Sequence, residues 1–161
     1  GAVNFVGNTI RNTTRSCWPA SAILYEVYAG RIEHNRILDF VQPCAVPSPR
    51  GSPSAIGVGS IRPFYPPVTA VVRFNDVAGN AGAGLRVAPS QASTLDARCN
   101  WWGSHDGPSG LGPGSGDALV AEPAQAPAPG SQPGAAAPAF APWAAAPIAG
   151  TGQASCSGGT E

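Results

Sequence analysis

The sequence lacks lysine and methionine altogether, and only 11% of its 161 residues are charged. Nine arginines balance nine acidic residues, so the chain has no net charge with which to attract nucleic acid or an anionic membrane. We also expect no signal peptide in it, and it contains no apolar run near the ~18 residues of a membrane-spanning helix. We therefore expect no nucleic-acid partner and no membrane insertion. Because methionine is missing, we further expect a processed chain or a fragment of a longer protein.

Helical periodicity is also missing almost everywhere, whereas glycine and proline are abundant, with 21 and 18 residues. Most of this bias lies after residue 103. Short segments with apolar residues two positions apart are typical of β-strands. Three such segments occur, at 22–25, 55–58 and 84–87. The pattern predicts one all-β domain with a loop-rich C-terminal part.

A repeated asparagine organises the first hundred residues. An apolar residue stands three positions before and two positions after each of four asparagines, in a chain that is only 43% apolar. The asparagines are Asn8, Asn35, Asn75 and Asn100, flanked by Phe5 and Ile10, Ile32 and Ile37, Val72 and Val77, and Ala97 and Trp102. Their irregular spacing, 27, 40 and 25 residues, suits a solenoid whose turns differ in loop length. An immunoglobulin-like sandwich would also have many short strands, but it would not require an asparagine at a fixed place in every unit.

This pattern resembles the right-handed parallel β-helix repeat of pectin-lyase-like proteins, in which an x-N-x-I turn recurs from coil to coil. The tryptophan-rich stretch Leu95–Ser104, followed by Asp106–Gly110 and Gly112–Asp117, is similar to the C-terminal segment common to many bacterial β-helix proteins. Phe140–Trp143 with Ala146–Ile148 is similar to the stretch that closes that segment.

The resemblance implies an all-β, right-handed parallel β-helix of about four coils, with an irregular Pro/Gly/Ala-rich C-terminal cap and tail. We expect coils at 1–103, a capping segment at 104–148 and a flexible tail at 149–161. The Ala/Pro-rich tract 121–138 departs from the family, in which a short connection is usual. We expect an extended loop there, because its composition buries little apolar area.

Stacking of coils would place equivalent residues ~4.8 Å apart. The four asparagine amides could then bond to one another in a row, whereas in the alternative each merely caps a local turn. In-register stacking would also set Glu33 beside Arg73 and Arg36 beside Asp76, which are opposite-charge pairs. Arg73 beside Arg98 argues against that register.

Four cysteines offer a test of the stacking. Cys17 and Cys44 each lie nine residues after a repeated asparagine, so stacked coils would bring their Cα atoms within disulfide distance. We expect a Cys17–Cys44 disulfide and hence an oxidising compartment, with two buried thiols as the alternative. Cys99 and Cys156 remain, and the even count permits a second bridge that ties the tail to the last coil.

The aromatic residues suggest both a cap and a binding surface. By the repeat, Trp102 points inward and covers the last coil, while Trp101 points outward. Sugars stack on exposed rings, so a glycan platform is the alternative role of these rings. The candidate stacking residues are Trp101, Tyr25, Tyr28, Phe64 and Tyr65.

Catalytic and metal-binding patterns are sparse. The two histidines, His34 and His105, belong to different coils, and no C-x-x-C spacing is present, so we expect no metal and no cofactor. Ser104-His105-Asp106 is predicted to be a polar turn, because adjacent residues cannot adopt the geometry of a catalytic triad. Glu33 and Asp76 are predicted to pair with arginines, and we expect no catalytic residue in this segment.

Three functional hypotheses follow. The first is a non-catalytic C-terminal β-helix and capping segment of a secreted or cell-surface bacterial protein. The second is a fragment of a polysaccharide lyase or glycoside hydrolase whose active site lies upstream. The third is a carbohydrate-binding or adhesin surface. We expect upstream β-helix coils, or self-association through the open N-terminal edge, to cover the first coil, and a polysaccharide or cell-surface glycan as a further partner.

Overall fold

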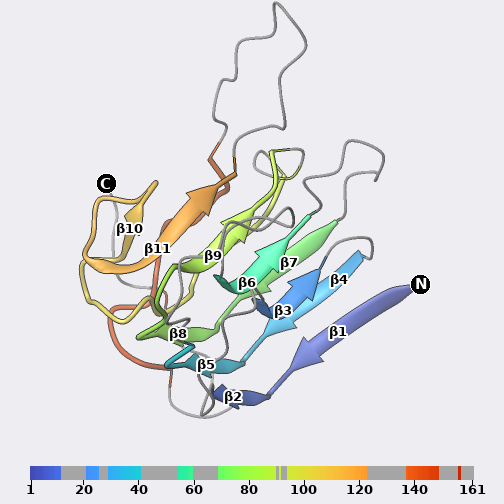
Figure 1. Cartoon of the computed structure of the whole chain (residues 1–161), viewed down its shortest axis with the longest axis horizontal. Helices are drawn as coiled ribbons and strands as arrows, with labels where there is room; N and C mark the ends of the chain where they lie inside the picture. The colour runs from blue at the N-terminus through green and yellow to red at the C-terminus, as the bar shows by residue number, and fades with distance from the viewer. Residues whose placement is uncertain are drawn as a thin grey trace, which may run out of the picture.

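The computed structural model describes residues 1–11, 21–25, 29–40, 54–59, 69–89, 91, 94–122, 137–148 and 156. Within these residues the chain is all-β and contains no helix (Figure 1). The expected tail, 149–161, and most of the expected extended loop, 121–138, lie outside the described residues. The strands are β1 (Ala2–Val6), β2 (Thr9–Arg11), β3 (Ser21–Tyr25), β4 (Ala29–Glu33), β5 (Arg36–Leu38), β6 (Ser54–Val58), β7 (Ala70–Arg73), β8 (Asp76–Ala78), β9 (Ala83–Val87), β10 (Pro108–Gly110) and β11 (Gly116–Ala121).

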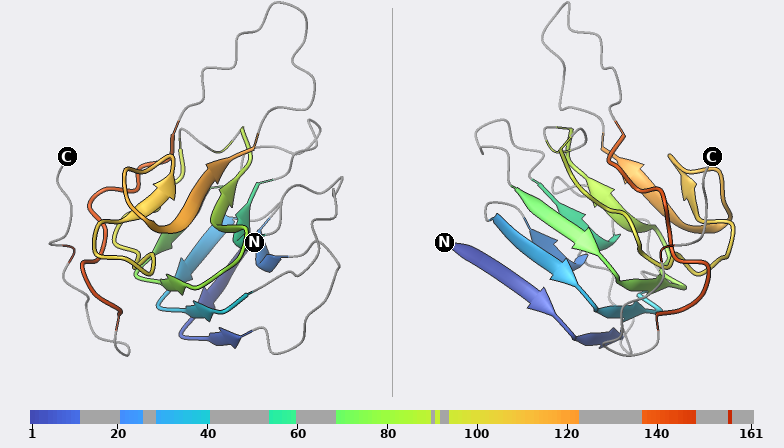
Figure 2. Two further views of the ribbon diagram at one scale, coloured as in Figure 1. Left: turned by 60° about the vertical axis from the view of Figure 1, so that its left-hand side comes forward. Right: turned by 180° about the vertical axis from the view of Figure 1, so that it is seen from behind.

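The strands form three parallel sheets, with orders β1-β4-β7, β2-β5-β8 and β10-β11-β9-β6-β3. The chain visits these sheets in the same sequence three times, and Figure 2 shows the resulting rows of neighbouring arrows. We call β1–β3 layer 1, β4–β6 layer 2 and β7–β9 layer 3. Residues 95–102 continue the stack as layer 4, through parallel bridges from Asp96 to Val71 and from Trp101 to Asp76.

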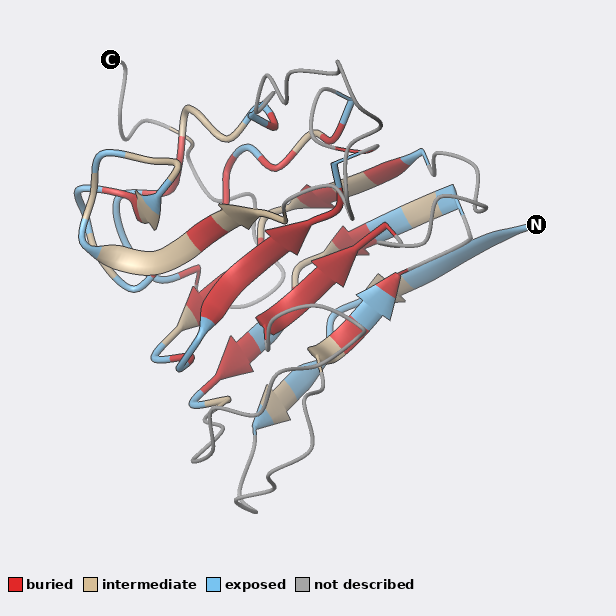
Figure 3. Cartoon of the chain, turned by 45° about the horizontal axis from the view of Figure 1, so that its top comes forward, coloured by how far each residue is buried: buried red, intermediate tan, exposed pale blue. Residues whose placement is uncertain are grey.

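The register places apolar residues of successive layers directly beside one another. Phe5 pairs with Ile32 and Ile32 with Val72 in the first sheet. In the third sheet Ile23 pairs with Ile56 and Ile56 with Leu85, so the period-two segments of the sequence are strands of one sheet. These columns meet in one buried core, and Figure 3 shows burial rising from β1 towards the middle of the stack.

A sharp turn separates the first two sheets in every layer. The residue immediately before each repeated asparagine has a positive φ: Gly7 (71°), His34 (57°), Phe74 (56°) and Cys99 (63°). This left-handed conformation costs a non-glycine residue ~1–2 kcal/mol, and the packing of both flanking strands offsets that cost. The same backbone geometry therefore recurs although four different residue types occupy the position.

The segment 137–148, which we call the closing segment, covers layer 4. The backbone N–H of Ala97 donates to Ala139 O at 2.7 Å, and that of Cys99 donates to Pro142 O at 2.7 Å. Trp143 is buried and its Nε1 donates to His105 O at 3.1 Å. A disulfide joins Cys99 of layer 4 to Cys156, with Cα atoms 5.0 Å apart. One end of the stack is thus closed by backbone hydrogen bonds and buried apolar surface.

Candidate functional site

The four repeated asparagines lie in one hydrogen-bonded row, which we call the asparagine column. The Nδ2 of each donates to the Oδ1 of the next: Asn8 to Asn35 at 2.9 Å, Asn35 to Asn75 at 3.0 Å, and Asn75 to Asn100 at 3.0 Å. The backbone N–H of each of the first three donates to the same oxygen, at 2.9–3.1 Å. The structure therefore brings these four residues together across layers, rather than using each only as a local turn cap.

Each internal asparagine also bonds to a strand of the preceding layer. Asn35 Nδ2 donates to Phe5 O at 2.9 Å and Asn75 Nδ2 donates to Ile32 O at 2.8 Å. Asn100 Nδ2 donates to Val72 O at 2.7 Å. These carbonyls belong to the residue three positions before the asparagine of the preceding layer. The column thus has a direction, since Asn35, Asn75 and Asn100 each accept two hydrogen bonds from the preceding layer and donate one to it.

A second polar row lies at the end of the second sheet, and the sequence reasoning missed it. Phe40 N donates to Asn80 Oδ1 at 2.9 Å, while Asn80 N and Nδ2 donate to Asp117 Oδ2 at 3.0 and 2.7 Å. Burial raises the pKa of Asp117, although the hydrogen bonds from Asn80 oppose the shift. One sequence signal could have indicated this row: Asn80 lies five residues after Asn75, and Phe40 lies five residues after Asn35, so the two occupy equivalent positions of the repeat.

The outward carboxylates of the middle layers are paired with arginines. Arg36 Nε lies 3.3 Å from Asp76 Oδ2, in the register expected from the sequence. Burial raises the pKa of Asp76 even though Arg36 acts in the opposite direction. Glu33 is the register partner of Arg73, but its ion pair, at 3.9 Å, is with Arg31 on its own strand.

Asp96 explains how Arg73 and Arg98, whose like charges argued against the register, can lie in neighbouring layers. Its carboxylate lies 2.9 Å from Arg98 and 3.8 Å from Arg73, so one negative charge lies between the two cations and reduces their repulsion. The hydrogen bond from Arg98 is the main reason why the pKa of Asp96 lies below its ordinary value. Glu33, Asp76 and Asp96 thus each form an ion pair with an arginine.

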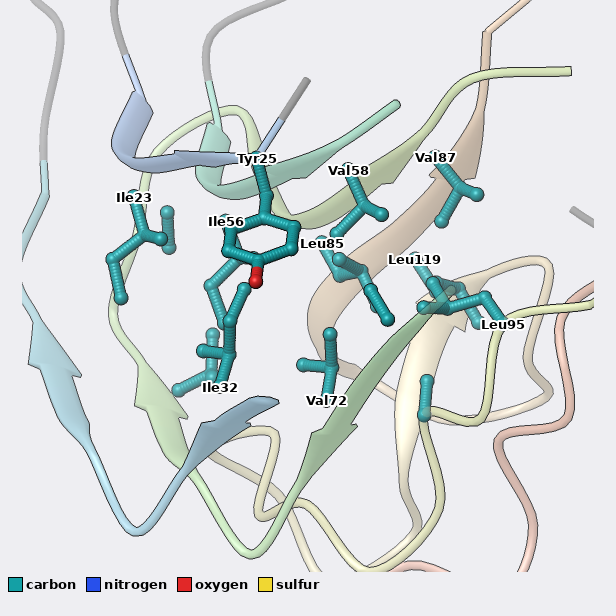
Figure 4. Packing of buried hydrophobic residues seen from close by; sticks show 14 of the residues in the cluster. Ile23, Tyr25, Ile32, Ile56, Val58, Val72, Leu85, Val87, Leu95 and Leu119 are labelled. Carbon is teal, nitrogen blue, oxygen red and sulfur yellow. The ribbon is translucent and has the colours of Figure 1, made fainter. Parts of the chain in front are cut away.

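Tyr25 corrects one expectation about the glycan platform. Its side chain is only 2% exposed, and its ring lies among Ile23, Ile56 and Ile32 inside the stack (Figure 4). The hydroxyl lies within hydrogen-bond distance of the carbonyl oxygens of Val3 and Ala29, either of which can accept its single proton. The period-two alternation places position 25 on the inward face, so this ring presents no surface to a sugar.

Of the other aromatic and cysteine residues singled out in the sequence, some lie within the described residues and some lie outside them. Trp102 is fully buried in the core, beside Gly84 of β9, whereas Trp101 stays partly exposed, as the repeat predicts. Five residues lie outside the described residues and their expected roles remain predictions: Tyr28, Phe64, Tyr65, Cys17 and Cys44.

The triad-like residue types form a hydrogen-bonded turn. Asp106 Oδ1 accepts from Ser115 N and from Ser115 Oγ, both at 3.0 Å. Hydrogen bonds from Ser104 and Ser115 lower the pKa of Asp106 to about 2. Within the described part of the chain, no group of three metal-ligating side chains gathers and no helix could span a bilayer.

The first layer ends in an open surface. Layer 1 has a neighbour on one side only, because β1, β2 and β3 each lie at the edge of a sheet. Val3, Val6 and Leu24 are the large apolar side chains that stand exposed in the described chain, at 38%, 52% and 39%, and all three belong to this layer. Asn8, also exposed, begins the asparagine column here. We call this surface, formed by β1, Asn8, β2 and β3, the layer 1 edge.

Comparisons with known proteins identify no relative: no family model, curated protein or solved structure matches this chain.

Proposed function

We propose that this chain is a right-handed parallel β-helix of about four coils, and that its role is structural: it terminates a stack of parallel coils and covers its end. Parallel strands joined through a crossover adopt the right-handed connection almost without exception, which supports the handedness. The observation that carries the proposal is the asparagine column, which runs through four layers in one direction and stops beneath the closing segment.

A terminating role is supported by the chemistry at the covered end. Asn100 Nδ2 donates to Ala97 O at 2.6 Å and Asn100 O accepts from Ala144 N at 3.0 Å. The closing segment also accepts hydrogen bonds from the N–H groups of Ala97 and Cys99, so it pairs backbone groups of layer 4 on the side away from layer 3. Each buried backbone group left without a partner would cost ~1–3 kcal/mol, so the closing segment removes a tendency of layer 4 to bind further chain.

Localisation is part of the proposal. The Cys99–Cys156 disulfide is the kind of bond that persists in oxidising surroundings, and we place the chain outside the cell or on the bacterial cell surface. The paired state of Asp76 and Asp96 favours this structural role over a hydrolase or lyase site within these layers.

Truncation tests the terminating role. A chain ending at Glu122 lacks the closing segment, so the N–H groups of Ala97 and Cys99 and the carbonyl of Asn100 lose their partners at one end, while the acceptor of Asn8 faces solvent at the other. Because donor end and acceptor end are complementary and the contact does not close on itself, the truncated chain is expected to assemble head to tail into filaments. Light scattering and electron microscopy measure this, with Cys156→Ser in the full-length chain as a control that keeps the closing segment.

The contrary result is a truncated chain that remains monodisperse and melts at the same temperature as the full-length protein. That outcome would show that residues 137–148 do not cover an adhesive end, and the terminating role would be wrong.

A glycan-binding surface remains a second candidate, supported by the partial exposure of Trp101 beside Asp76 on the outer face of the second sheet. A Trp101→Ala variant tests it on a glycan array. Binding that the substitution abolishes would favour this role, and an array without signals for the unaltered chain would exclude it.

A further inference from the structure

The layer 1 edge lacks a fixed set of hydrogen bonds. Asn35, Asn75 and Asn100 each receive, from the preceding layer, one bond from a backbone N–H, one bond from an asparagine Nδ2, and a carbonyl for their own Nδ2. Asn8 has none of the three: within the described chain its Oδ1 accepts no bond, and its Nδ2 donates only to Asn35 Oδ1 and, at 3.3 Å, to Val6 O. The edge therefore specifies which groups an additional layer would supply.

The backbone of the edge is also unpaired on its outer side. Arg36 N donates to Asn8 O at 2.8 Å, so Asn8 O points towards layer 2. In a parallel strand the N–H and C=O of the next residue point to the opposite side, so those of Thr9 face outward. Unpaired strand groups of this kind bind an incoming strand readily.

The burial of the apolar side chains also indicates that layer 1 lacks a neighbouring layer on its outer side. Ile32 and Ile37 of layer 2 and Val72 and Val77 of layer 3 are fully buried between neighbouring layers. Their counterparts in layer 1, Phe5 and Ile10, pack on the core from one side only and remain partly exposed. A further layer with apolar residues at these two positions would bury them as the inner layers are buried.

On these grounds we propose that the layer 1 edge binds a polypeptide segment that adds one parallel layer, with an asparagine over Asn8 and apolar residues over Phe5 and Ile10. The inference rests on the proposed function, and it specifies the partner: a strand–turn–strand segment of the same asparagine repeat. Its asparagine supplies a backbone N–H and Nδ2 to Asn8 Oδ1, and the carbonyl three residues earlier accepts from Asn8 Nδ2.

A second copy of this chain fits the edge poorly in either orientation. The end that would supply donors to Asn8 is Asn100, whose amide is fully buried beneath the closing segment. Two layer 1 edges placed face to face would set one Asn8 Oδ1 against another, acceptor against acceptor. The direction of the asparagine column thus favours a separate segment that carries free donors.

The test uses the full chain and a peptide that copies residues 70–78, Ala-Val-Val-Arg-Phe-Asn-Asp-Val-Ala. In the register of the inner layers its asparagine would lie over Asn8 and its two apolar positions over Phe5 and Ile10. We expect saturable binding by calorimetry, with amide NMR shifts concentrated in residues 2–11. A peptide with the Asn75→Asp change keeps the shape but loses the Nδ2 donor and sets a carboxylate against Asn8 Oδ1, so it should bind at least tenfold more weakly.

A protein variant supplies the matched control. Thr9→Pro removes only an outward N–H, and proline is tolerated on edge strands, so it should abolish peptide binding while the chain stays folded. Protection of the Asn35 and Asn75 amides from hydrogen exchange reports folding in the same sample. Unprotected amides would mean that the layered structure itself, and with it the proposed function, is wrong.

Protected amides with no peptide binding, or binding that is indifferent to both changes, would overturn this inference alone. So would concentration-dependent dimerisation that Thr9→Pro removes, because it would assign the edge to a second copy.

Discussion

At the scale of single residues, the asparagine column shows that the number of hydrogen bonds made by one side-chain type depends on how deeply the residue is buried. Asn75 is fully buried and bonds to Asn35, Asn100 and the carbonyl of Ile32. Asn8 is exposed at the edge and bonds to Asn35 of layer 2 and, at 3.3 Å, to Val6 O of its own layer. Loss of a buried amide leaves several neighbours unpaired at once, and loss of an exposed one lets water replace it.

Replacement of Asn75 by leucine is therefore expected to lower the free energy of unfolding by about 3 kcal/mol or more, because Asn35 and Asn100 then both lose partners inside the protein. The same replacement at Asn8 should cost about 1 kcal/mol or less. Urea denaturation followed by circular dichroism measures both. Equal losses at the two positions would contradict a cooperative column.

The residue scale also shows what the sequence could reveal. The sequence revealed the four asparagines of the column because the same apolar residues flank each of them. A pattern of one asparagine and two apolar positions, repeated four times, is visible without coordinates. Asn80 and Asp117 were missed because the two residues differ in type, lie 37 residues apart and are not flanked by the same apolar pattern. Tyr25 was misplaced because an aromatic residue suggests a surface role until the alternation of its own strand is followed.

At the scale of elements, the second polar row ties the turn after β8 to β11. Asp117 accepts two bonds from Asn80, and Asp39 lies close enough that its negative charge further raises the pKa of Asp117. A carboxyl whose folded pKa lies above its unfolded value keeps its proton longer in the folded chain. Its contribution to stability is then present below the unfolded pKa, 3.8, and is lost as the pH rises through the folded value.

The Asp117→Asn variant has no such titration at this position. We expect the free energy of unfolding of the variant, minus that of the unaltered chain, to increase as the pH rises from below 3.8 to neutrality. Parallel chemical denaturation series from pH 3 to pH 7 measure the difference. A difference that stays constant, or falls, would show that Asp117 does not titrate with a raised pKa.

Whether an element could be predicted depended on whether its pattern was local. The strands β3, β6 and β9 follow from alternation within five residues, and their register follows from repetition. The strands β10 and β11 were not predicted, because Pro108–Gly110 and Gly116–Ala121 have no such alternation. Their extended form depends on pairing with each other and with β9, a tertiary effect that a local reading misses.

At the scale of the whole molecule, stability is distributed unevenly between the two ends of the stack. One end is covered by the closing segment and tied by Cys99–Cys156, which encloses a loop of 57 residues. The other is the layer 1 edge, with unpaired strands and the three exposed apolar side chains. Local opening is expected to begin at the less protected end.

The paired replacement of Cys99 and Cys156 by serine tests the tied end. On the chain-entropy model a loop of this length contributes about 4 kcal/mol, so the variant should melt at a distinctly lower temperature. Hydrogen exchange should accelerate most at the Ala97, Cys99 and Ala144 amides and least in β6. Unchanged melting, or faster exchange in β6 instead, would show that the bridge does not hold the closing segment.

The spacing of the asparagine column carries one more consequence. Stretches of 27, 40 and 25 residues separate its members, yet their amides meet at nearly the same distance. The register of the layers is thus independent of the number of residues between successive asparagines of the column. We expect extra sequence inserted in those stretches to be accommodated without disturbing the interior, so that foreign peptides could be displayed from successive layers.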